Sequence, residues 1–272
     1  MRFIFLFAIY YWNVMEDNIL YTLKETTGDL GVLKEIDILI KESKSKSYDV
    51  SGSSKNEING LKYIMNKHKN VLCSFIPKNM HTEFMFTWTC TLQTRKHSKT
   101  GFRKRELQIH SNIIDYLANC LKNKEIKFAA VMLSIQYHNC KDKEPKAHAN
   151  LLIYNKETNT IERFDPIGSS RTVYDNKRLD KQLLSYFQKY NIKYSPPEEF
   201  CPKISFQKIQ GREKQFKFGL CAAWTIWYLD FKLTNSHISD SKQLIDAALA
   251  KLKTTNSLTQ FILNYIRHVL YS

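Results

Sequence analysis

The sequence predicts an α+β domain, because strand-like and helix-like segments alternate along the chain from about residue 82 onward. The strand-like segments are short and rich in aromatic and β-branched residues, whereas the helix-like segments carry apolar residues at helical spacing. A chain of 272 residues is long enough to bury the core that such a domain needs. We therefore expect a central mixed sheet flanked by helices.

Five segments are expected to form strands: 83–94, 126–138, 148–155, 160–166 and 203–210. Each combines apolar, aromatic or β-branched residues, and polar residues that favour a turn follow it. The third and fourth segments are short and only the polar sequence KETN separates them. Together they predict a β-hairpin.

Five segments are expected to form helices: 106–123, 176–192, a run beginning at or beside Cys221, about 240–252 and 257–270. The run CAAWTIWYLDFKL is mostly apolar and holds no helix breaker, which is typical of a buried helix. Its aromatic residues Trp224, Trp227 and Tyr228 recur at helical spacing. We expect them to pack in the core rather than to bind a ligand.

The first 80 residues are expected to form an extension and a helical arm, distinct from a catalytic domain over 81–272. Within the arm, apolar spacing predicts helices over 29–46 and about 57–68, joined by a polar loop rich in Ser and Lys.

Residues 1–14 begin with Arg2 and an apolar run that is short for a membrane span. The run resembles the start of a secretory signal but lacks a small-residue cleavage site. Three interpretations stay open for this segment: a membrane anchor, a docking segment, or a translated extension before a true start at Met15.

The chain is strongly basic, with a formal net charge of +15 and more Lys than Arg. This charge indicates an acidic partner, a nucleic acid or a membrane surface. Specific base readout favours Arg, because its planar guanidinium matches base edges. The densest basic stretch, TRKHSKTGFRKRE at 94–106, is either a solvated loop or a docking patch for an acidic partner or nucleic acid.

The six cysteines lack paired CxxC spacing, so the sequence predicts no zinc site, and it indicates no other cofactor. Six are also too few for a disulfide scaffold in a chain of this length. We expect reduced, mostly buried thiols and a cytoplasmic location.

Cys221 stands out from the other cysteines because it is expected at the start of a helix. A thiol there lies at the positive end of the helix dipole, which favours the thiolate. Gly219 allows a sharp turn just before it, and the small residues Ala222 and Ala223 leave room for a substrate backbone. A small core residue at the start of a buried helix is the simpler alternative for this segment taken alone.

Thiol catalysis also needs a base and a group that orients the base. If residues 156 and 157 form the tip of the predicted hairpin, His148 pairs with Asp165 across it. Directly paired side chains lie close enough for a carboxylate to hold an imidazole. A slip in the register would make Asn150 or Glu162 the orienting group instead.

The third need is a donor that stabilises the oxyanion of the tetrahedral intermediate. The segment before the thiol holds three glutamines, Gln207, Gln210 and Gln215. The side-chain amide of Gln215 or Gln210, together with the backbone N–H of Cys221, would form such a hole.

The order of these residues resembles the ubiquitin-like-protein (SUMO-type) and adenoviral-type cysteine proteases. Members have a His at the start of a strand, an Asp after the next strand and, in many, a Gln six residues before the Cys. Here Asp165 follows His148 by seventeen residues, and Gln215 precedes Cys221 by six. The segments AHANLLIYNKETNTIERFDPIG and GLCAAWTIWYLD further resemble uncharacterised members encoded by large DNA viruses.

The resemblance covers about residues 125–235 and implies a papain-like fold with Cys221 as nucleophile, His148 as base and Asp165 as its orienter. It implies ubiquitin-like conjugates or viral polyproteins as substrates. The chain has Ala149 where members typically have Trp after the His, and Leu220 and Ala222 where they have Asp and Gly around the Cys. Those neighbours shape the substrate channel.

Two alternatives use the same residues differently. An acyltransferase of the same fold would pass an acetyl group from acetyl-CoA to a hydroxyl or amine. An inactive module would only bind a ubiquitin-like partner through the basic surface.

Overall fold

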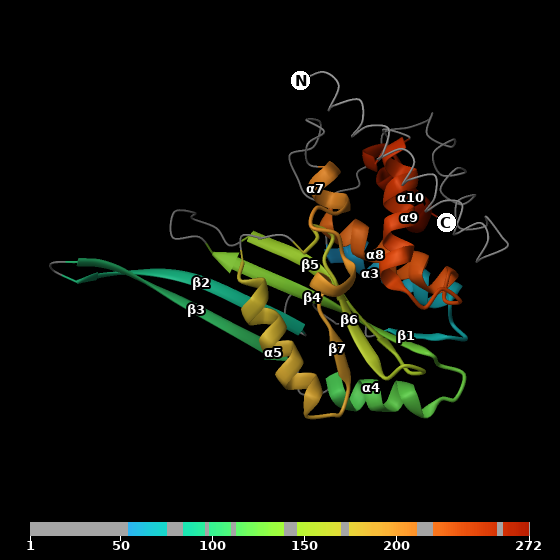
Figure 1. Cartoon of the computed structure of the whole chain (residues 1–272), viewed down its shortest axis with the longest axis horizontal. Helices are drawn as coiled ribbons and strands as arrows, with labels where there is room; N and C mark the ends of the chain where they lie inside the picture. The colour runs from blue at the N-terminus through green and yellow to red at the C-terminus, as the bar shows by residue number, and fades with distance from the viewer. Residues whose placement is uncertain are drawn as a thin grey trace, which may run out of the picture.

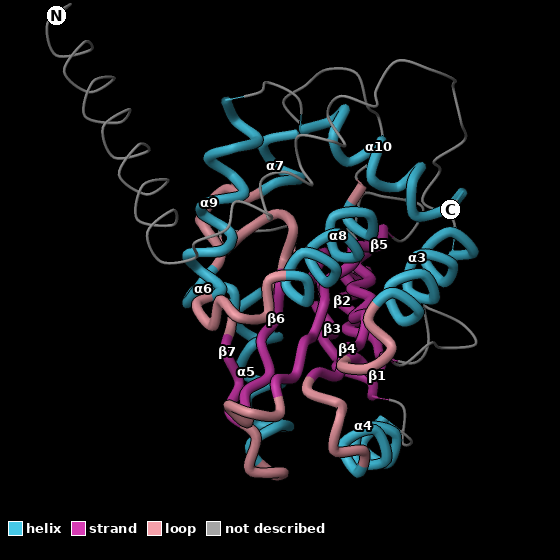
Figure 2. The backbone as a smooth tube through the Cα atoms, turned by 90° about the vertical axis from the view of Figure 1, so that its right-hand side faces the viewer, coloured by secondary structure: helices cyan, strands magenta, loops and turns pink. Residues whose placement is uncertain are grey.

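The computed structural model describes residues 54–74, 84–95, 98–109, 113–138, 146–169, 174–210, 220–254 and 258–271. In this part of the chain a seven-stranded mixed sheet has helices on both faces, as Figures 1 and 2 show, so the predicted α+β class is confirmed. Residues 1–14 and the helix expected over 29–46 lie outside the described residues.

The strands are β1 (Leu72–Ser74), β2 (Phe84–Arg95), β3 (Ser98–Ile109), β4 (Phe128–His138), β5 (Lys146–Asn155), β6 (Thr160–Phe164) and β7 (Lys193–Ser195). Their order across the sheet is β3-β2-β4-β5-β6-β7. The β2–β3, β4–β5 and β5–β6 pairs are antiparallel, whereas β2–β4 and β6–β7 are parallel. The short β1 also pairs with β4 in parallel, near the opposite end of β4 from β2.

The helices are α3 (Ser54–Lys67), α4 (Ile113–Lys122), α5 (Asn176–Gln188), α6 (Pro197–Phe200), α7 (Phe206–Gln210), α8 (Cys221–Thr234), α9 (Ser241–Thr254) and α10 (Leu258–Tyr271). The predicted helices at about 57–68, 176–192, 240–252 and 257–270 and the one starting at Cys221 are confirmed within a few residues.

Two of the predicted elements are wrong, and so is the loop considered for the basic stretch 94–106, because β2 ends at Arg95 and residues 98–106 lie in β3. Residues 106–109 continue β3, where they pair with β2, so the helix predicted from 106 begins only at Ile113. The strand predicted over 203–210 is instead the short helix α7. Phe206 and Ile209 are also one helical turn apart, and the buried ring of Phe206 packs against Trp224 of α8 with centroids 5.1 Å apart. In both cases contacts with neighbouring elements, β2 in the first and α8 in the second, determine the secondary structure in place of the local sequence pattern.

The helix α8 is the centre of the larger core cluster. Its residues from Ala222 to Leu233 are all buried, and the rings of Trp224, Trp227 and Tyr228 are nearly inaccessible, as predicted. Helix α3 approaches α8 so closely that a Cβ at Gly60 would lie 2.7 Å from Ile226 Cδ1. Helix α8 is thus packed between α3 and strand β5 of the sheet.

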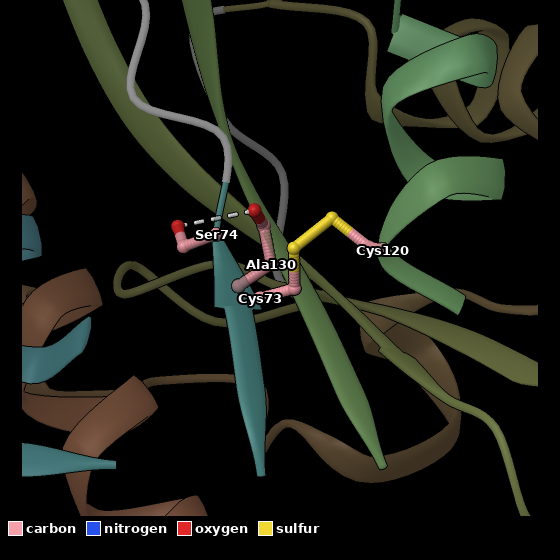
Figure 3. Close-up of a disulfide and its surroundings, with 4 residues drawn as sticks. All are labelled: Cys73, Ser74, Cys120 and Ala130. Carbon is pink, nitrogen blue, oxygen red and sulfur yellow. Dashed lines mark hydrogen bonds between the residues drawn. A yellow bond between two sulfur atoms is a disulfide. The ribbon is translucent and has the colours of Figure 1, made fainter. Parts of the chain in front are cut away.

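Two of the cysteines form a disulfide, which corrects the expectation of reduced thiols throughout. Figure 3 shows Cys73 of β1 bonded to Cys120 of α4, with Cα atoms 5.8 Å apart. Beside it, Ser74 Oγ donates to Ala130 O of β4 at 3.2 Å. Cysteine counting misses this bond because β1 and α4 become neighbours only when both pack against β4.

Loss of this disulfide is expected to lower the free energy of unfolding by about 2–4 kcal/mol, because the bond closes a long loop in the unfolded chain. The two cysteines are 47 residues apart. Urea unfolding of the Cys73→Ala, Cys120→Ala double variant measures the loss. Dithiothreitol should lower the urea midpoint of the natural chain to that of the variant and leave the variant unchanged. Equal midpoints for the natural chain with and without dithiothreitol would contradict the prediction.

Candidate functional site

Cys221 is the first residue of α8 and is partly exposed, whereas the residues from Ala222 to Leu233 are buried. The preceding residue, Leu220, supplies no side-chain cap to the helix. The backbone N–H groups of the first turn therefore direct their positive partial charge toward the position of the thiol. Such a position favours the thiolate form of a cysteine.

His148 lies near the start of β5 with only 5% of its surface exposed. Its Nε2 atom is 2.9 Å from Asp165 Oδ1, and its ring also hydrogen-bonds the Cys221 side chain. Burial alone would lower the pKa of His148. The negative charge of Asp165, hydrogen bonds with Asp165 and Cys221, and the charge at Cys221 outweigh that effect and raise the pKa to about 10. The imidazole is therefore protonated at neutral pH.

Asp165 follows the last residue of β6 and is completely buried. Besides His148, it accepts hydrogen bonds from the hydroxyl of Tyr174 and, at 3.0 Å, from the backbone N–H of Ile167. Burial would raise the pKa of Asp165, but the charge and hydrogen bond of His148, the charge of Arg163 and the Tyr174 hydrogen bond together lower it. The carboxylate stays ionised in spite of its burial.

The turn after Asp165 is tied to the segment before α7. Gly168 has a φ of +102°, and a Cβ on it would lie 2.5 Å from Pro202 O, so the turn needs glycine here. The N–H of Gly168 donates to Asp165 O at 2.9 Å, and the N–H of Ser205 donates to Ile167 O at 3.0 Å. These bonds fix the direction in which the Asp165 side chain leaves the backbone.

The hairpin that carries His148 and Asp165 has a different register from the predicted one. Leu151 pairs with Phe164 and Asn155 with Thr160, so residues 156–159 form the turn. This shifts the pairing by two residues from the predicted one, which is an even number and keeps every side chain on its predicted face. His148 and Asp165 therefore meet although they are not direct cross-strand partners.

A buried ionic cluster surrounds the carboxylate, and sequence reasoning missed it. Arg163 has no exposed surface, its Nη1 is 3.6 Å from Asp165 Oδ2, and it also donates to Asn150 Oδ1. Its Nε and Nη2 atoms form a pair of 2.9 Å bonds with the two oxygens of Asp180 in α5. One signal was present in the sequence. Side chains two residues apart on a strand point to the same face, so Arg163 and Asp165 share a face with the buried Ile161. This spacing indicated that Arg163 points inward together with the carboxylate.

The two alternative orienting groups have other partners. Asn150 is buried and accepts from Arg163, while its amide donates to Ala149 O at 3.0 Å. Glu162 accepts from Tyr228 at 3.0 Å and from Ser241 at 2.6 Å, on the side of the sheet that faces α8 and α9.

The candidate oxyanion donors are not brought to the thiol by any described contact. Gln210 ends α7 rather than a strand, and its side chain lies outside the described part, as does the whole of Gln215. Gln207, which is described, has a buried side-chain oxygen without a hydrogen-bond partner.

No family model matches the chain. An ankyrin repeat protein of Acanthamoeba polyphaga mimivirus is 33% identical to it over 141 residues, which cover 45% of this chain and 18% of the relative. The chain thus matches less than a fifth of the length of that relative.

Three solved structures are similar at low identity. The Legionella pneumophila effector protein RavZ is 10% identical, with a TM-score of 0.43 over 80% of this chain and 64% of RavZ. The Chlamydia trachomatis effector protein Cdu1, solved bound to ubiquitin, is 11% identical, with a TM-score of 0.41 over 77% of this chain and 95% of Cdu1. The SUMO protease Ulp1 is 10% identical, with a TM-score of 0.32 over 85% of this chain and 97% of Ulp1. These likenesses place the chain in no family.

None of the helices in the described part is both long and apolar enough to cross a membrane.

Proposed function

We propose that this chain is a cysteine peptidase that hydrolyses a peptide or isopeptide bond through a thioester on Cys221. One observation carries the proposal. Cys221, His148 and Asp165 come from the start of a helix and from two strands, yet they form one hydrogen-bonded series. A partly exposed cysteine, a protonated imidazole and a buried carboxylate in that order are the parts that nucleophilic thiol catalysis requires.

In the proposed reaction the Cys221 thiolate attacks the carbonyl carbon of the scissile bond. His148, protonated at rest because its pKa is raised to about 10, gives its proton to the departing nitrogen as the C–N bond breaks. The acyl group is then held as a thioester, and His148 is neutral. It accepts a proton from the attacking water, the C–S bond breaks, and the product acid leaves with Cys221 again a thiolate.

Asp165 serves this cycle by holding the ring of His148 in one orientation and stabilising its charged form. For the oxyanion we keep Gln215 or Gln210 with the backbone N–H of Cys221 as the proposed donors. The catalytic unit is proposed to span 81–272, and α3 and β1 of the preceding extension pack against it at α8 and β4.

For the substrate we propose a conjugate of a ubiquitin-like protein, in the cytoplasm of the cell where the chain is made. The motif around His148, Asp165 and Cys221 supports this class, because its spacing resembles proteases that act on such conjugates. A viral polyprotein cut after small residues is the other class that the same resemblance implies.

An electrophilic probe tests both the chemistry and the substrate class. Ubiquitin, SUMO and other ubiquitin-like proteins carrying a C-terminal vinyl sulfone should form a covalent adduct with the natural chain, and Cys221→Ala should abolish it. Cys201→Ala is the matched control and should label normally. Cys201 is the other free thiol among the described residues, and burial raises its pKa.

Mass spectrometry of the adducts decides the outcome. Adducts that persist in Cys221→Ala would contradict the proposed nucleophile. Acetylation of Cys221 by acetyl-CoA, with no adduct from any vinyl sulfone, would replace the peptidase by the acyltransferase. The absence of both would leave a binding module.

A further inference from the structure

A basic groove lies along α5, on the sheet face opposite α8, and ends against Leu107 of β3. In Figure 1, α5 is the yellow helix drawn across the strands near β7. The groove encloses about 460 Å³ and is lined chiefly by Arg178, Lys181, Gln182, Tyr186 and Lys189. We call it the α5 groove.

The described lining of the α5 groove is positively charged. Of the lining side chains that the structure describes, three are cationic and none is acidic. Arg178, Lys181 and Lys189 are exposed, and no ion pair of theirs occurs among the described residues. Cations gathered in a concave surface concentrate anionic partners.

The groove also contains a polar group that lacks a partner. The Oε1 atom of Gln182 is buried and accepts no hydrogen bond. A buried acceptor normally has a donor, from the protein, a water molecule or a ligand. A rotation of the Gln182 side chain about its terminal torsion would bring this oxygen to a backbone N–H of an extended peptide lying in the groove.

The length of the groove sets the size of the occupant. Arg178 and Lys189 are eleven positions apart on and just beyond α5, which at about 1.5 Å per residue is about 16 Å. An extended peptide covers this distance with about five residues. We propose that the α5 groove binds an acidic segment of about five residues in a protein partner.

The lining favours a peptide over a nucleic acid. Single-stranded nucleic acids bind where successive exposed aromatic rings accept stacked bases. Tyr186 is the one aromatic ring among the described residues that line the groove, and it is half-buried, with its centroid 5.2 Å from that of Phe187. A peptide instead needs charge and a hydrogen-bonding amide, and the groove has both.

The groove begins close to the proposed catalytic centre. Tyr174, which donates to Asp165, precedes Arg178 by four residues, and Asp175 between them caps α5 by accepting from the Arg178 N–H. A partner docked by its acidic segment would therefore have its chain near the start of β5, which carries His148. This link to substrate selection rests on the proposed function, whereas the binding itself does not.

Binding is tested with the full chain carrying Cys221→Ser, so that no cleavage interferes. The probe is a fluorescein-labelled peptide with five consecutive Glu residues, and its Gln counterpart is the neutral comparison. Fluorescence anisotropy should show binding of the Glu peptide that weakens as salt is raised, and at least tenfold weaker binding of the Gln peptide.

The triple variant Arg178→Glu, Lys181→Glu, Lys189→Glu should weaken binding of the Glu peptide at least tenfold. The matched control is Lys62→Glu, Lys69→Glu, Lys124→Glu, which makes the same change of net charge at exposed positions outside the groove. It should change the affinity by less than twofold at physiological salt. Neutral Gln substitutions at the three groove positions repeat the test if the Glu variant does not fold.

Equal loss in the groove and control variants would overturn the proposal, since net charge alone would then explain binding. A single-stranded oligo(dT) of twenty nucleotides that binds more tightly than the peptide, and loses affinity in the groove variant only, would overturn it in favour of a nucleic-acid site. Because no outcome depends on Cys221 chemistry, failure here and failure of the peptidase are separate results.

Discussion

Asp165→Asn is expected to lower kcat/KM by about 10²–10⁴-fold, the usual contribution of a positioned acid–base group. Asn keeps the size of the side chain but removes the Asp165 charge, the largest of the contributions that together outweigh burial and raise the pKa of His148 to about 10. Without that charge, burial lowers the pKa of His148, and the imidazole loses its proton at a lower pH. We expect the alkaline limb of the kcat/KM profile to move to lower pH in the variant.

The same change alters stability in a direction that the pKa fixes. His148 has a folded pKa above its ordinary value of 6.5, so its stabilising contribution is complete below about pH 6.5 and is lost as the pH rises through about 10. The difference in unfolding free energy between the natural chain and Asp165→Asn should therefore be larger at pH 6 than at pH 10. Urea unfolding at the two values measures it.

Asp175→Asn is the matched control for the loss of one negative charge near the site. Its carboxylate caps α5 by accepting from the Arg178 N–H at 3.1 Å, and Asn caps a helix about as well as Asp. Activity and pH profile should stay close to those of the natural chain. If Asp165→Asn also left both unchanged, Asp165 would not be the group that orients His148.

The parts of the site that sequence reasoning found are those that local pattern determines. Cys221 was expected at the start of a helix because an unbroken apolar run follows it, and α8 begins at that residue. His148 and Asp165 were expected on one face of a hairpin because two short strands flank a polar turn. The predicted register was wrong by two residues. Because this is an even number, both side chains still point to the same face and come into contact.

The parts that it missed depend on tertiary neighbours. Apolar and polar residues alternate over 203–210 as they would in a strand. In the structure Phe206–Gln210 form α7, and the ring of Phe206 packs against Trp224 of α8. The disulfide joins elements that only a shared strand brings together. In the sequence Arg163 looks like an ordinary charged strand residue. Its partner Asp180 lies seventeen positions later, on α5, and the pairing depends on how α5 packs against the sheet.

Replacing Arg163 by Met is expected to lower the free energy of unfolding by about 3–5 kcal/mol, because breaking a buried ion pair leaves its partner charged and without compensation. Arg163 is fully buried and holds both oxygens of Asp180 at 2.9 Å. Met keeps an unbranched apolar stem but lacks the guanidinium, so the loss includes the missing charge and the space that the guanidinium filled. Arg178→Met, at an exposed position on α5, is the matched control and should change stability by about 0.5 kcal/mol or less.

The unpaired charge of Asp180 in Arg163→Met can be removed by protonation or by substitution. Each should restore part of the lost free energy of unfolding. Burial raises the pKa of Asp180 and the Arg163 charge opposes that rise, so without Arg163 the carboxyl takes up a proton more readily in the folded chain. A group whose folded pKa lies above its unfolded value binds more protons when folded, which makes stability fall as the pH rises. The cost of Arg163→Met should thus be smaller at pH 5 than at pH 8.

Asp180→Asn in the Arg163→Met background removes the same charge at every pH. The double variant should be more stable at pH 8 than Arg163→Met alone, and the dependence of the loss on pH should weaken. The single variant Asp180→Asn completes the comparison. If the losses of unfolding free energy in Arg163→Met and Asp180→Asn simply added in the double variant, and neither depended on pH, the Arg163–Asp180 pair would not be what stabilises this region. The support of Asp165 would then rest on Tyr174 and the Ile167 N–H, which also donate to it.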